Sequence, residues 1–256
     1  RQLSTNLVEG KSITRTCHTK QLRMKIQSRW SEALDTELSL ISHYKLYPSL
    51  LPWVGQRYDT QQVRLLVVGE SHYLKKESRY HHNDEAWYTG LDTSKYDDHH
   101  WFFTRNIINN GLQSHWKEKS KLIYKNIEKA LLNSRFGDSV ELSPFDQIAY
   151  MNYFQRPAQI TGKSLVHTPL DRERSAEVFL SVVTALKPDV VIFCSKLAWR
   201  AMRSSDCANA MGNTRFAVTP HPATRWWHTE MKKHNGKSGK DLFIEAIRWP
   251  QSTAIS

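Results

Sequence analysis

The fold follows from one stretch of sequence, Val63-Arg64-Leu65-Leu66-Val67-Val68-Gly69-Glu70-Ser71-His72-Tyr73. Its first half is almost continuously apolar, which is typical of a strand buried on both faces of a parallel sheet. The strand ends at Gly69, whose lack of a side chain lets backbone N–H groups approach a ligand. In open α/β sheets, ligands bind beyond the carboxyl ends of the strands, so the polar turn that follows is a candidate functional site.

Further apolar runs predict three more strands, separated by helical patterns. The strands are expected over residues 148–154, 190–194 and 216–219. The helices are expected over residues 101–111, 117–133, 175–186, 196–203 and 241–247. Strands that alternate with helical crossovers predict an α/β fold with helices on both faces of a parallel sheet. We therefore expect a three-layer α/β/α domain, monomeric, with a central four-stranded, mainly parallel sheet.

The N-terminal region is expected to lie outside this sheet. Residues 1–20 are polar and basic, and a flexible solvated terminus explains them better than a DNA-binding arm. An apolar residue recurs at every fourth position from Leu22 to Leu38, which predicts a helical extension over residues 20–47. The chain thus divides into an arm, residues 1–20, and a single domain, residues 21–256.

The composition favours a polyanionic partner. The chain of 256 residues carries a formal net charge of +11, and 11% of its residues are aromatic. Basic surfaces attract nucleic acids and aromatic side chains stack on bases, although a basic surface can also serve solubility alone. Three scattered cysteines, Cys17, Cys194 and Cys207, cannot supply a four-cysteine iron–sulfur site, and they fit a reducing, cytoplasmic setting. No metal or cofactor is expected. No apolar run approaches the ~20 residues of a membrane span, so no membrane partner is expected.

Two other strands also end at residues that can do chemistry. One ends within Tyr150-Met151-Asn152-Tyr153-Phe154-Gln155-Arg156-Pro157, and the other opens Phe216-Ala217-Val218-Thr219-Pro220-His221-Pro222-Ala223-Thr224-Arg225-Trp226-Trp227. The amide of Asn152 offers both a donor and an acceptor, so it can read the edge of a base. The ring of His221, fixed between two prolines, is a candidate proton or charge partner.

In this order the motifs resemble those of the uracil-DNA glycosylase superfamily over residues 63–247, with Pro-Asp-Val-Val-Ile-Phe at 188–193 as a further strand. The turn at 69–73 is similar to the family's Gly-Gln-Asp-Pro-Tyr and Gly-Glu-Ala-Pro-Gly turns. The resemblance implies a DNA glycosylase that flips a base out of the helix and cleaves its C1′–N bond. It also implies a base pocket formed by Asn152, Gly69, His72 and Tyr73, with Tyr73 packed beside the base.

The charges of this reaction suggest catalytic roles. Cleavage places positive charge on the sugar and negative charge on the departing base, so a carboxylate near the sugar and a donor near the base both stabilise the transition state. Glu70 is the candidate carboxylate or water base, and His221 is the candidate donor. Ser71 stands where the family's most active branch has an Asp; a serine is a weak base but can hold a water. The motifs contain no clear catalytic lysine, so no Schiff-base lyase step is expected.

Departures from the family pattern leave the substrate open. His72 replaces a proline, and the polar, histidine-rich segment 74–100 has no counterpart. Because this segment lacks periodicity, we expect a long loop at the active face. The expected base is uracil or a bulkier one, such as a glucosylated cytosine in phage DNA. The superfamily includes an antiphage glycosylase of that kind, which suggests a role in defence.

Single- or double-stranded DNA is expected to contact the residues that follow His221. Arg225, Trp226 and Trp227 stand where the family has a wedge that enters the duplex. The lysines beyond them suit phosphate contacts. The candidates are Arg225, Trp226, Trp227, Lys232, Lys233 and Lys237. The alternative for the two tryptophans is a hydrophobic cover for the sheet, and the alternative for the lysines is an ordinary surface loop.

Two other functions remain open. Ser71 and His72 could mark a domain that binds DNA or a modified base without cleaving it. A metal-dependent nuclease that uses Asp97, Asp98, His99 and His100 ranks lower, because adjacent residues rarely converge on one ion. Purely structural roles would be a salt bridge for Glu70, a turn for His221, a strand-end cap for Asn152 and the core for Tyr73.

Overall fold

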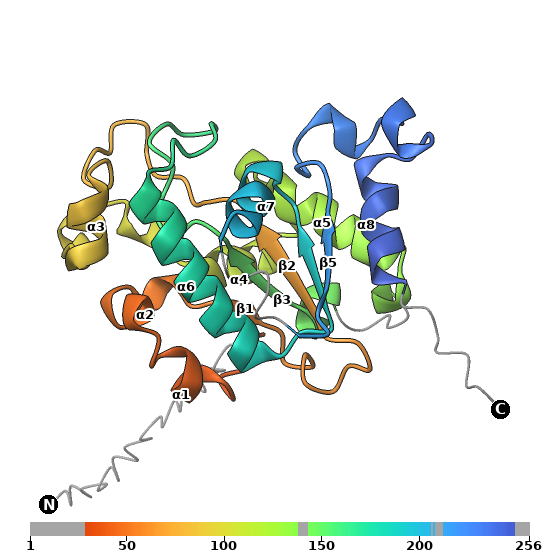
Figure 1. Ribbon diagram of the computed structural model, residues 1–256, viewed down its shortest axis with the longest axis horizontal. Helices are drawn as coiled ribbons and strands as arrows, with labels where there is room; N and C mark the ends of the chain where they lie inside the picture. The colour runs from red at the N-terminus through yellow and green to blue at the C-terminus, as the bar shows by residue number, and fades with distance from the viewer. Residues whose placement is uncertain (1–28, 138–142, 206, 208–211, 249–256) are drawn as a thin grey trace, which may run out of the picture.

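A five-stranded sheet lies at the centre of the protein (Figure 1). The structure, a computed structural model, describes residues 29–137, 143–205, 207 and 212–248. The strands are β1 Trp53–Val54, β2 Leu65–Gly69, β3 Ala149–Asn152, β4 Val190–Phe193 and β5 Arg215–Val218, in the spatial order β1-β3-β2-β4-β5. β1 runs antiparallel to β3, and the other neighbouring pairs are parallel. The α/β class expected from the sequence is therefore confirmed.

The expected number of four strands is wrong by one. β1 contains only Trp53 and Val54, which pair with Tyr150 and Ala149 at the edge of the sheet. Two residues are too few for an alternating pattern to be visible in the sequence. All four predicted strands are present close to their expected positions.

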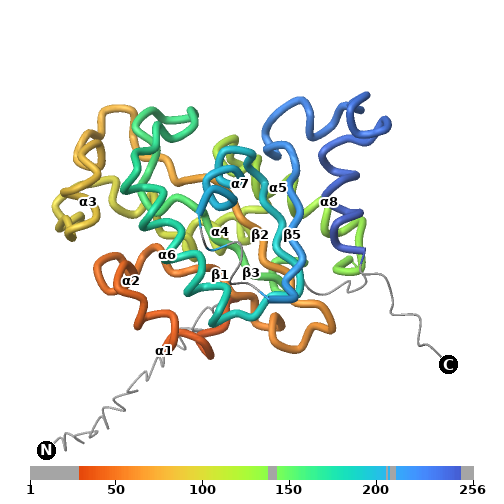
Figure 2. Tube along the Cα trace, in the orientation of Figure 1, coloured from red at the N-terminus to blue at the C-terminus, as the bar shows by residue number. Residues whose placement is uncertain are grey.

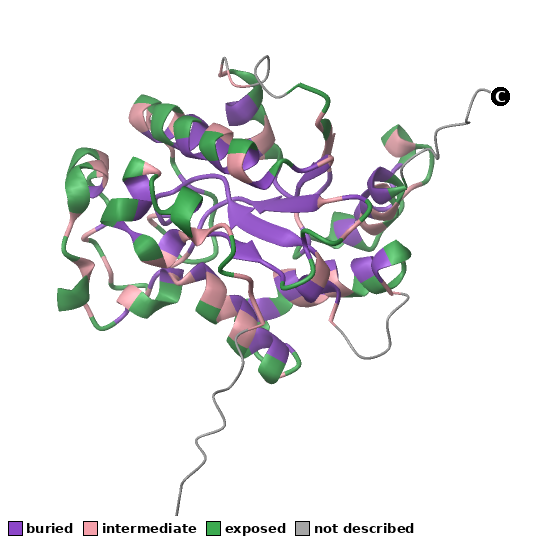
Figure 3. Ribbon diagram, turned by 90° about the horizontal axis from the view of Figure 1, so that it is seen from below, coloured by how far each residue is buried: buried purple, intermediate pink, exposed green. Residues whose placement is uncertain are grey.

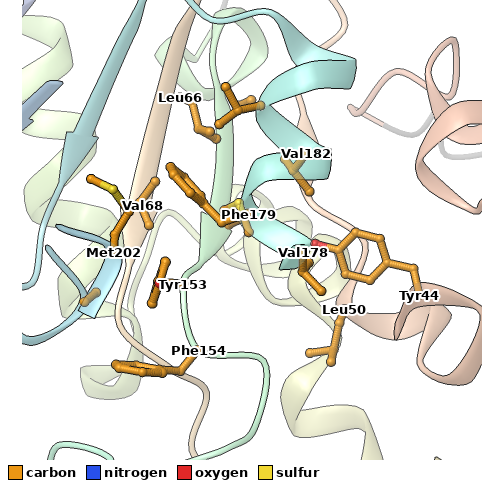
Figure 4. Close-up of a cluster of buried hydrophobic side chains, with 14 of the residues drawn as sticks. Tyr44, Leu50, Leu66, Val68, Tyr153, Phe154, Val178, Phe179, Val182 and Met202 are labelled. Carbon is orange, nitrogen blue, oxygen red and sulfur yellow. The ribbon is translucent and has the colours of Figure 1, made fainter. Parts of the chain in front are cut away.

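Alternate residues of the strands face opposite sides of the sheet. In β2, Leu66 and Val68 pack into one hydrophobic cluster, part of which is drawn in Figure 4, whereas Leu65 and Val67 pack into a second cluster. Figure 3 shows the strands buried between helices above and below them. This double burial explains why the strand is apolar at nearly every position.

Helices cover both faces of the sheet. The face that carries Val68 is covered by α1 Asp35–Leu38, α2 Ser42–Leu46, α3 Asp84–Gly90, α6 Pro169–Leu186 and α7 Lys196–Arg203. The opposite face is covered by α4 Thr104–Gln113, α5 Leu122–Leu132 and α8 Gly239–Ile247. Short 3-10 helices are η1 Pro48–Leu50, η2 Thr93–Lys95, η3 His99–Phe102, η4 Lys119–Lys121, η5 Arg135–Gly137, η6 Pro144–Gln147, η8 Arg225–Trp227 and η9 Lys232–His234. Among the described residues, no helix is long and apolar enough to cross a membrane.

Capping side chains decide where two of the predicted helices begin. α7 has its expected bounds, and Ser195 caps it by accepting a hydrogen bond from the Ala198 N–H. α6 begins at Pro169 rather than at the expected residue 175, because Thr168 and Asp171 form a capping box.

The expected helical extension over residues 20–47 is only partly helical where the structure describes it, and it is not one continuous helix. Trp30 forms an antiparallel bridge with Gly55, and the Ser31 N–H donates to the Val54 carbonyl, so this stretch pairs with the sheet edge. Two short helices, α1 and α2, follow, separated by the extended residue Ile41. Tertiary pairing thus overrides the local helical pattern. The arm at residues 1–20 lies outside the described residues.

The segment 74–100 is not the plain loop that the sequence suggested. It contains α3, η2 and the start of η3. Asn83 caps α3 by accepting a hydrogen bond of 2.8 Å from the Ala86 N–H. Asn83 and the acidic residues that follow it are a helix-start signal, which the lack of apolar periodicity in this segment obscured.

Candidate functional site

A cavity of about 680 Å³ opens at the carboxyl edge of the sheet. It is lined by the ends of β2 and β3 and by the turn after β5, three segments that are far apart in the chain. Every residue predicted to act in catalysis or base binding lines it, namely Gly69, Glu70, Ser71, His72, Tyr73, Asn152 and His221. The segments that follow these strands leave the sheet on the same side, at the top of Figure 2.

Glu70 is a buried carboxylate held by neutral donors. The Ser195 hydroxyl donates to Oε2 at 2.6 Å, and the Leu165 N–H donates to Oε1 at 3.3 Å. Its side chain forms no ion pair with the described residues, so a salt-bridge role finds no support there. A carboxylate without a nearby cation can stabilise positive charge that develops on a bound substrate.

His221 presents a donor from a fixed turn. The Ala223 N–H donates to its Nδ1 at 3.3 Å, so in the neutral ring the proton sits on Nε2. Burial lowers the pKa of His221, and the nearby charge of Glu70 opposes that shift only in part. Asn126 of α5 donates to the Pro222 carbonyl at 2.8 Å and thereby anchors the turn. The neutral ring can therefore donate a hydrogen bond from Nε2.

Asn152 is oriented by its neighbours on the sheet. The Tyr150 hydroxyl donates to Asn152 Oδ1 at 3.1 Å, whereas Nδ2 makes no hydrogen bond to a described residue. Gly69 lies beside this pair, and a Cβ at Gly69 would come within 2.2 Å of Asn152 Oδ1. The glycine is required here by close packing of side chains, in addition to any approach by a ligand.

Ser71 and His72 differ in their partners. The Ser71 hydroxyl is buried and has no hydrogen-bond partner among the described residues. His72 Nε2 lies 3.1 Å from the Thr104 hydroxyl, and burial lowers the pKa of His72 to about 3. His72 is therefore neutral near pH 7 and connects the turn to the first residue of α4. Ser71 is free to bind a water or a substrate atom.

Tyr73 joins the cavity from the end of the same turn. Its backbone forms an isolated parallel bridge with Ala158, which fixes the turn against the segment after β3. Burial, with a smaller contribution from the charge of Glu70, raises the pKa of Tyr73 to about 12. The hydroxyl of Tyr73 therefore stays protonated near pH 7, and its half-buried ring offers an uncharged aromatic wall.

Other lining residues of the cavity come from segments that the sequence did not single out as part of the site. Asn106 and Asn110 of α4 line it, together with Glu118 and Lys121 at η4. These side chains supply amide, carboxylate and ammonium groups to the cavity, which the exposed Trp101 also lines. Lys121 is largely buried and pairs with Glu118 at 2.9 Å. Such a wall suits a substituent that carries hydroxyl groups.

The segment 74–100 contributes little to the cavity. Of this segment, only its last residue, His100, lines the cavity. His81 and His82 instead hydrogen-bond the carbonyls of Ala158 and Gln159, at 3.0 and 3.1 Å. His81 and His82 therefore hold the segment after β3, and His100 alone brings segment 74–100 to the cavity.

The acidic and histidine residues at 97–100 do not form a metal site in the structure. Asp98 is buried and accepts hydrogen bonds from the Lys75 N–H and from the hydroxyls of Ser78 and Tyr80. The part of the chain that the structure describes contains no cluster of three or more His, Cys, Asp or Glu residues arranged for a metal. Cys194 and Cys207 are free thiols, and Cys17 lies outside the described residues.

The two tryptophans predicted to contact DNA have different environments. Trp226 is 42% exposed, and the guanidinium of Arg225 lies 4.2 Å from its ring centre. Trp227 is fully buried and packs against Phe243 of α8, with ring centres 5.6 Å apart. The predicted DNA contact is therefore wrong for Trp227, because α8 approaches closely at Gly239 and covers it.

The lysines predicted to contact DNA also differ in their environments. Lys232 and Lys233 are exposed, whereas Lys237 pairs with Glu245 at 2.7 Å and so has part of its charge neutralised. The neighbouring ammonium of Lys233 lowers the pKa of Lys196, which opens α7. The basic surface thus extends onto α7, a connection between distant segments that the sequence could not reveal.

Two positioning residues were also missed in the sequence. Ser195, which holds Glu70, stands directly after the apolar run at 190–194 and before a helical pattern, so its place at a strand end was a usable signal. Tyr150, which holds Asn152, gave no such signal, because it lies inside an apolar strand.

No protein-family model matches this chain, and no curated protein matches it either. The family suggested by the motifs therefore remains a proposal.

Proposed function

We propose that the protein is a monofunctional DNA glycosylase of the uracil-DNA glycosylase type. One observation carries the proposal: the Glu70 carboxylate, the His221 ring and the Asn152 amide line the same cavity. A sugar-side carboxylate and a base-side donor are the two groups that cleavage of a C1′–N bond needs most. The amide supplies recognition of the base edge.

In the proposed reaction the target nucleotide leaves the stack and enters the cavity. As the bond between C1′ and the base nitrogen breaks, the electron pair stays with the base. Glu70 stabilises the positive charge on the sugar, and the N–H at Nε2 of His221 stabilises the negative charge on the base. A water near Ser71 adds hydroxide to C1′, and its proton ends on the departing base. The products are the free base and an abasic site.

The size and polarity of the cavity favour a substituted pyrimidine. Its volume of about 680 Å³ lies in the range that holds drug-sized ligands, so an unsubstituted base would leave space. The wall formed by Asn106, Asn110, Glu118 and Lys121 offers donors and acceptors for hydroxyl groups. A glucosylated cytosine of phage DNA fits this chemistry, with uracil as the simpler alternative. The proposed setting is cytoplasmic antiphage defence by a monomer that needs no metal.

The proposal is tested with duplexes that differ in one base. Uracil, cytosine, 5-hydroxymethylcytosine and glucosylated 5-hydroxymethylcytosine are incubated with the protein in EDTA and then treated with alkali. We expect alkali-dependent strand breaks on at least one modified duplex and none on plain cytosine. Binding without breaks on every duplex would instead favour a domain that binds a modified base, for which the serine at position 71 is the motivating observation. A parallel reaction contains Mg²⁺ in place of EDTA and receives no alkali; breaks that appear only there would favour a nuclease.

The polar wall is tested separately by Asn110→Ala. We expect this variant to lose about tenfold in activity on the glucosylated base, since one hydrogen bond to a substituent is lost. Its activity on uracil should stay unchanged, because uracil carries no substituent to bond with Asn110. An equal loss on both bases would show that the wall does not select the substituent.

A further inference from the structure

Tyr150 and Asn152 form a hydrogen-bonded pair at the end of β3. They are two residues apart on one strand, so their side chains lie on the same face of the sheet. The Tyr150 hydroxyl donates to Asn152 Oδ1 at 3.1 Å, and both side chains are almost completely buried. Both also line the cavity, so this pair lies where a bound base would sit.

Gly69 makes room for the pair. Gly69 lies opposite Asn152 in the parallel register of β2 and β3. A Cβ at this glycine would come within 2.2 Å of the Tyr150 hydroxyl as well as of Asn152 Oδ1. The hydroxyl and the amide oxygen therefore pack directly against the backbone, which restricts rotation of the amide. Burial raises the pKa of Tyr150 well above its ordinary value, so the hydroxyl keeps its proton and remains a donor.

We infer that Tyr150 is the specificity-determining residue that fixes the orientation of the Asn152 amide, and so decides which type of pyrimidine edge the cavity accepts. This inference rests on the proposed function. A hydroxyl that donates holds the amide oxygen beside it and leaves the two N–H donors of Nδ2 free. Turning the amide by half a turn would exchange its donor and its acceptor.

The edges of the two pyrimidine types carry opposite patterns. Cytosine presents an amino donor next to an unprotonated ring nitrogen, whereas uracil presents a carbonyl acceptor next to a protonated ring nitrogen. One fixed amide orientation matches only one of them. A bidentate contact of this kind discriminates by about ten- to a hundredfold. Without the hydroxyl both orientations become available, so the discrimination should be lost.

The inference is tested with two bases that share a 5-substituent and differ only in this edge, 5-hydroxymethylcytosine and 5-hydroxymethyluracil. Single-turnover excision from duplexes is measured for the wild type, Tyr150→Phe and the control Tyr58→Phe. Tyr58 is equally buried, and its hydroxyl donates to the Leu186 carbonyl at 3.2 Å, away from the cavity. We expect a rate ratio of about tenfold or more in the wild type and in the control. In Tyr150→Phe the ratio should approach one.

A second measurement separates this inference from the proposed reaction. The two free nucleosides are titrated into the same three proteins by calorimetry. If no protein excises a base but the affinity ratio collapses only in Tyr150→Phe, the inference stands and the glycosylase proposal fails. The inference is overturned if folded Tyr150→Phe keeps the wild-type ratio, or if the wild type distinguishes the bases in neither measurement.

Discussion

Two groups of buried polar residues follow β3 and β2, and they differ in how fully their hydrogen-bonding capacity is used. Arg156 and Asp171 form an ion pair with both side chains completely buried. Two nitrogens of the guanidinium meet the two carboxylate oxygens at 2.9 and 2.6 Å, and a third donates to the His81 carbonyl at 3.0 Å. This pair ties the segment after β3 to α6 and to the segment 74–100.

The cavity shows the opposite condition. The Ser71 hydroxyl has no partner and Nδ2 of Asn152 makes no hydrogen bond, in both cases among the described residues. Glu70 is buried with neutral donors only. Buried polar groups are normally satisfied, so free capacity beside a cavity indicates that a ligand completes it. Buried groups whose hydrogen-bonding capacity is fully used have a structural role. Arg156 is therefore structural and Glu70 functional, although both belong to the motifs.

The largest expected effect is on turnover, from Glu70→Gln. Loss of the carboxylate removes charge stabilisation that acts mainly in the transition state, so single-turnover excision should fall by about 10²–10⁴-fold. DNA binding should persist, and the free energy of unfolding should fall less than in Asp171→Asn, because one neutral hydrogen bond to Oε1 or Oε2 is lost and no cation loses its partner. Near-wild-type excision by Glu70→Gln would remove Glu70 from the mechanism.

The same chemical change at Asp171 should act on stability. Asp171→Asn leaves the buried guanidinium of Arg156 without its counter-charge, which typically costs about 3–5 kcal/mol. Denaturant unfolding measures this loss directly. At low temperature, the fraction that stays folded should still excise bases at a rate far above that of Glu70→Gln. A stable Asp171→Asn protein with abolished excision would reverse the assignment of the two groups.

His221→Ala comes next. Removal of the Nε2 donor should slow base release by about 10²–10³-fold, as loss of a donor to a developing anion does elsewhere. The loss should be greater for a cytosine derivative than for uracil, since the poorer leaving group needs more help. Excision rates on both duplexes measure this difference. An equal and small loss on every base would make the histidine a structural part of the turn.

The smallest effect concerns pH. Burial lowers the pKa of His72 to about 3 and that of His43 and His81 to about 4. The folded state keeps these rings neutral, whereas in the unfolded chain they take up a proton below pH ~6.5. The free energy of unfolding is therefore highest above pH ~6.5 and decreases as the pH falls towards 4. Each histidine should add up to about 1.4 kcal/mol per pH unit to the slope of the free energy of unfolding. His72→Asn, measured at pH 7, 6 and 5, should reduce that slope; an unchanged slope would contradict the neutral state of His72.

Several parts of the site could be predicted because parallel strands end at one edge. Gly69 and Asn152 end the buried strands β2 and β3, and His221 follows the half-buried strand β5, so their meeting in one cavity follows from topology. β2, β3 and β4 were visible in the sequence because they are buried at every position, and burial on both faces leaves a nearly continuous apolar run. β1 was not, since two residues carry no pattern.

The remainder depends on contacts that span the chain. The sequence gives no reason to distinguish the adjacent residues Trp226 and Trp227. Only the close approach of α8 buries Trp227. The extended pairing of Trp30 with Gly55 competes with a good helical pattern. Which polar groups keep free hydrogen-bonding capacity is a matter of distances of a few ångströms, as between Tyr150 and Asn152, and no spacing in the sequence records it.

The central claim is that the cavity cleaves the bond between a base and its sugar. Mass spectrometry of the reaction in EDTA tests it most directly, with a duplex that carries one glucosylated cytosine or one uracil. We predict that free base and abasic DNA appear together in equal amounts with the wild-type protein and only slowly with Glu70→Gln. Intact duplex after full binding, or release of nucleotides in place of the free base, would contradict the account.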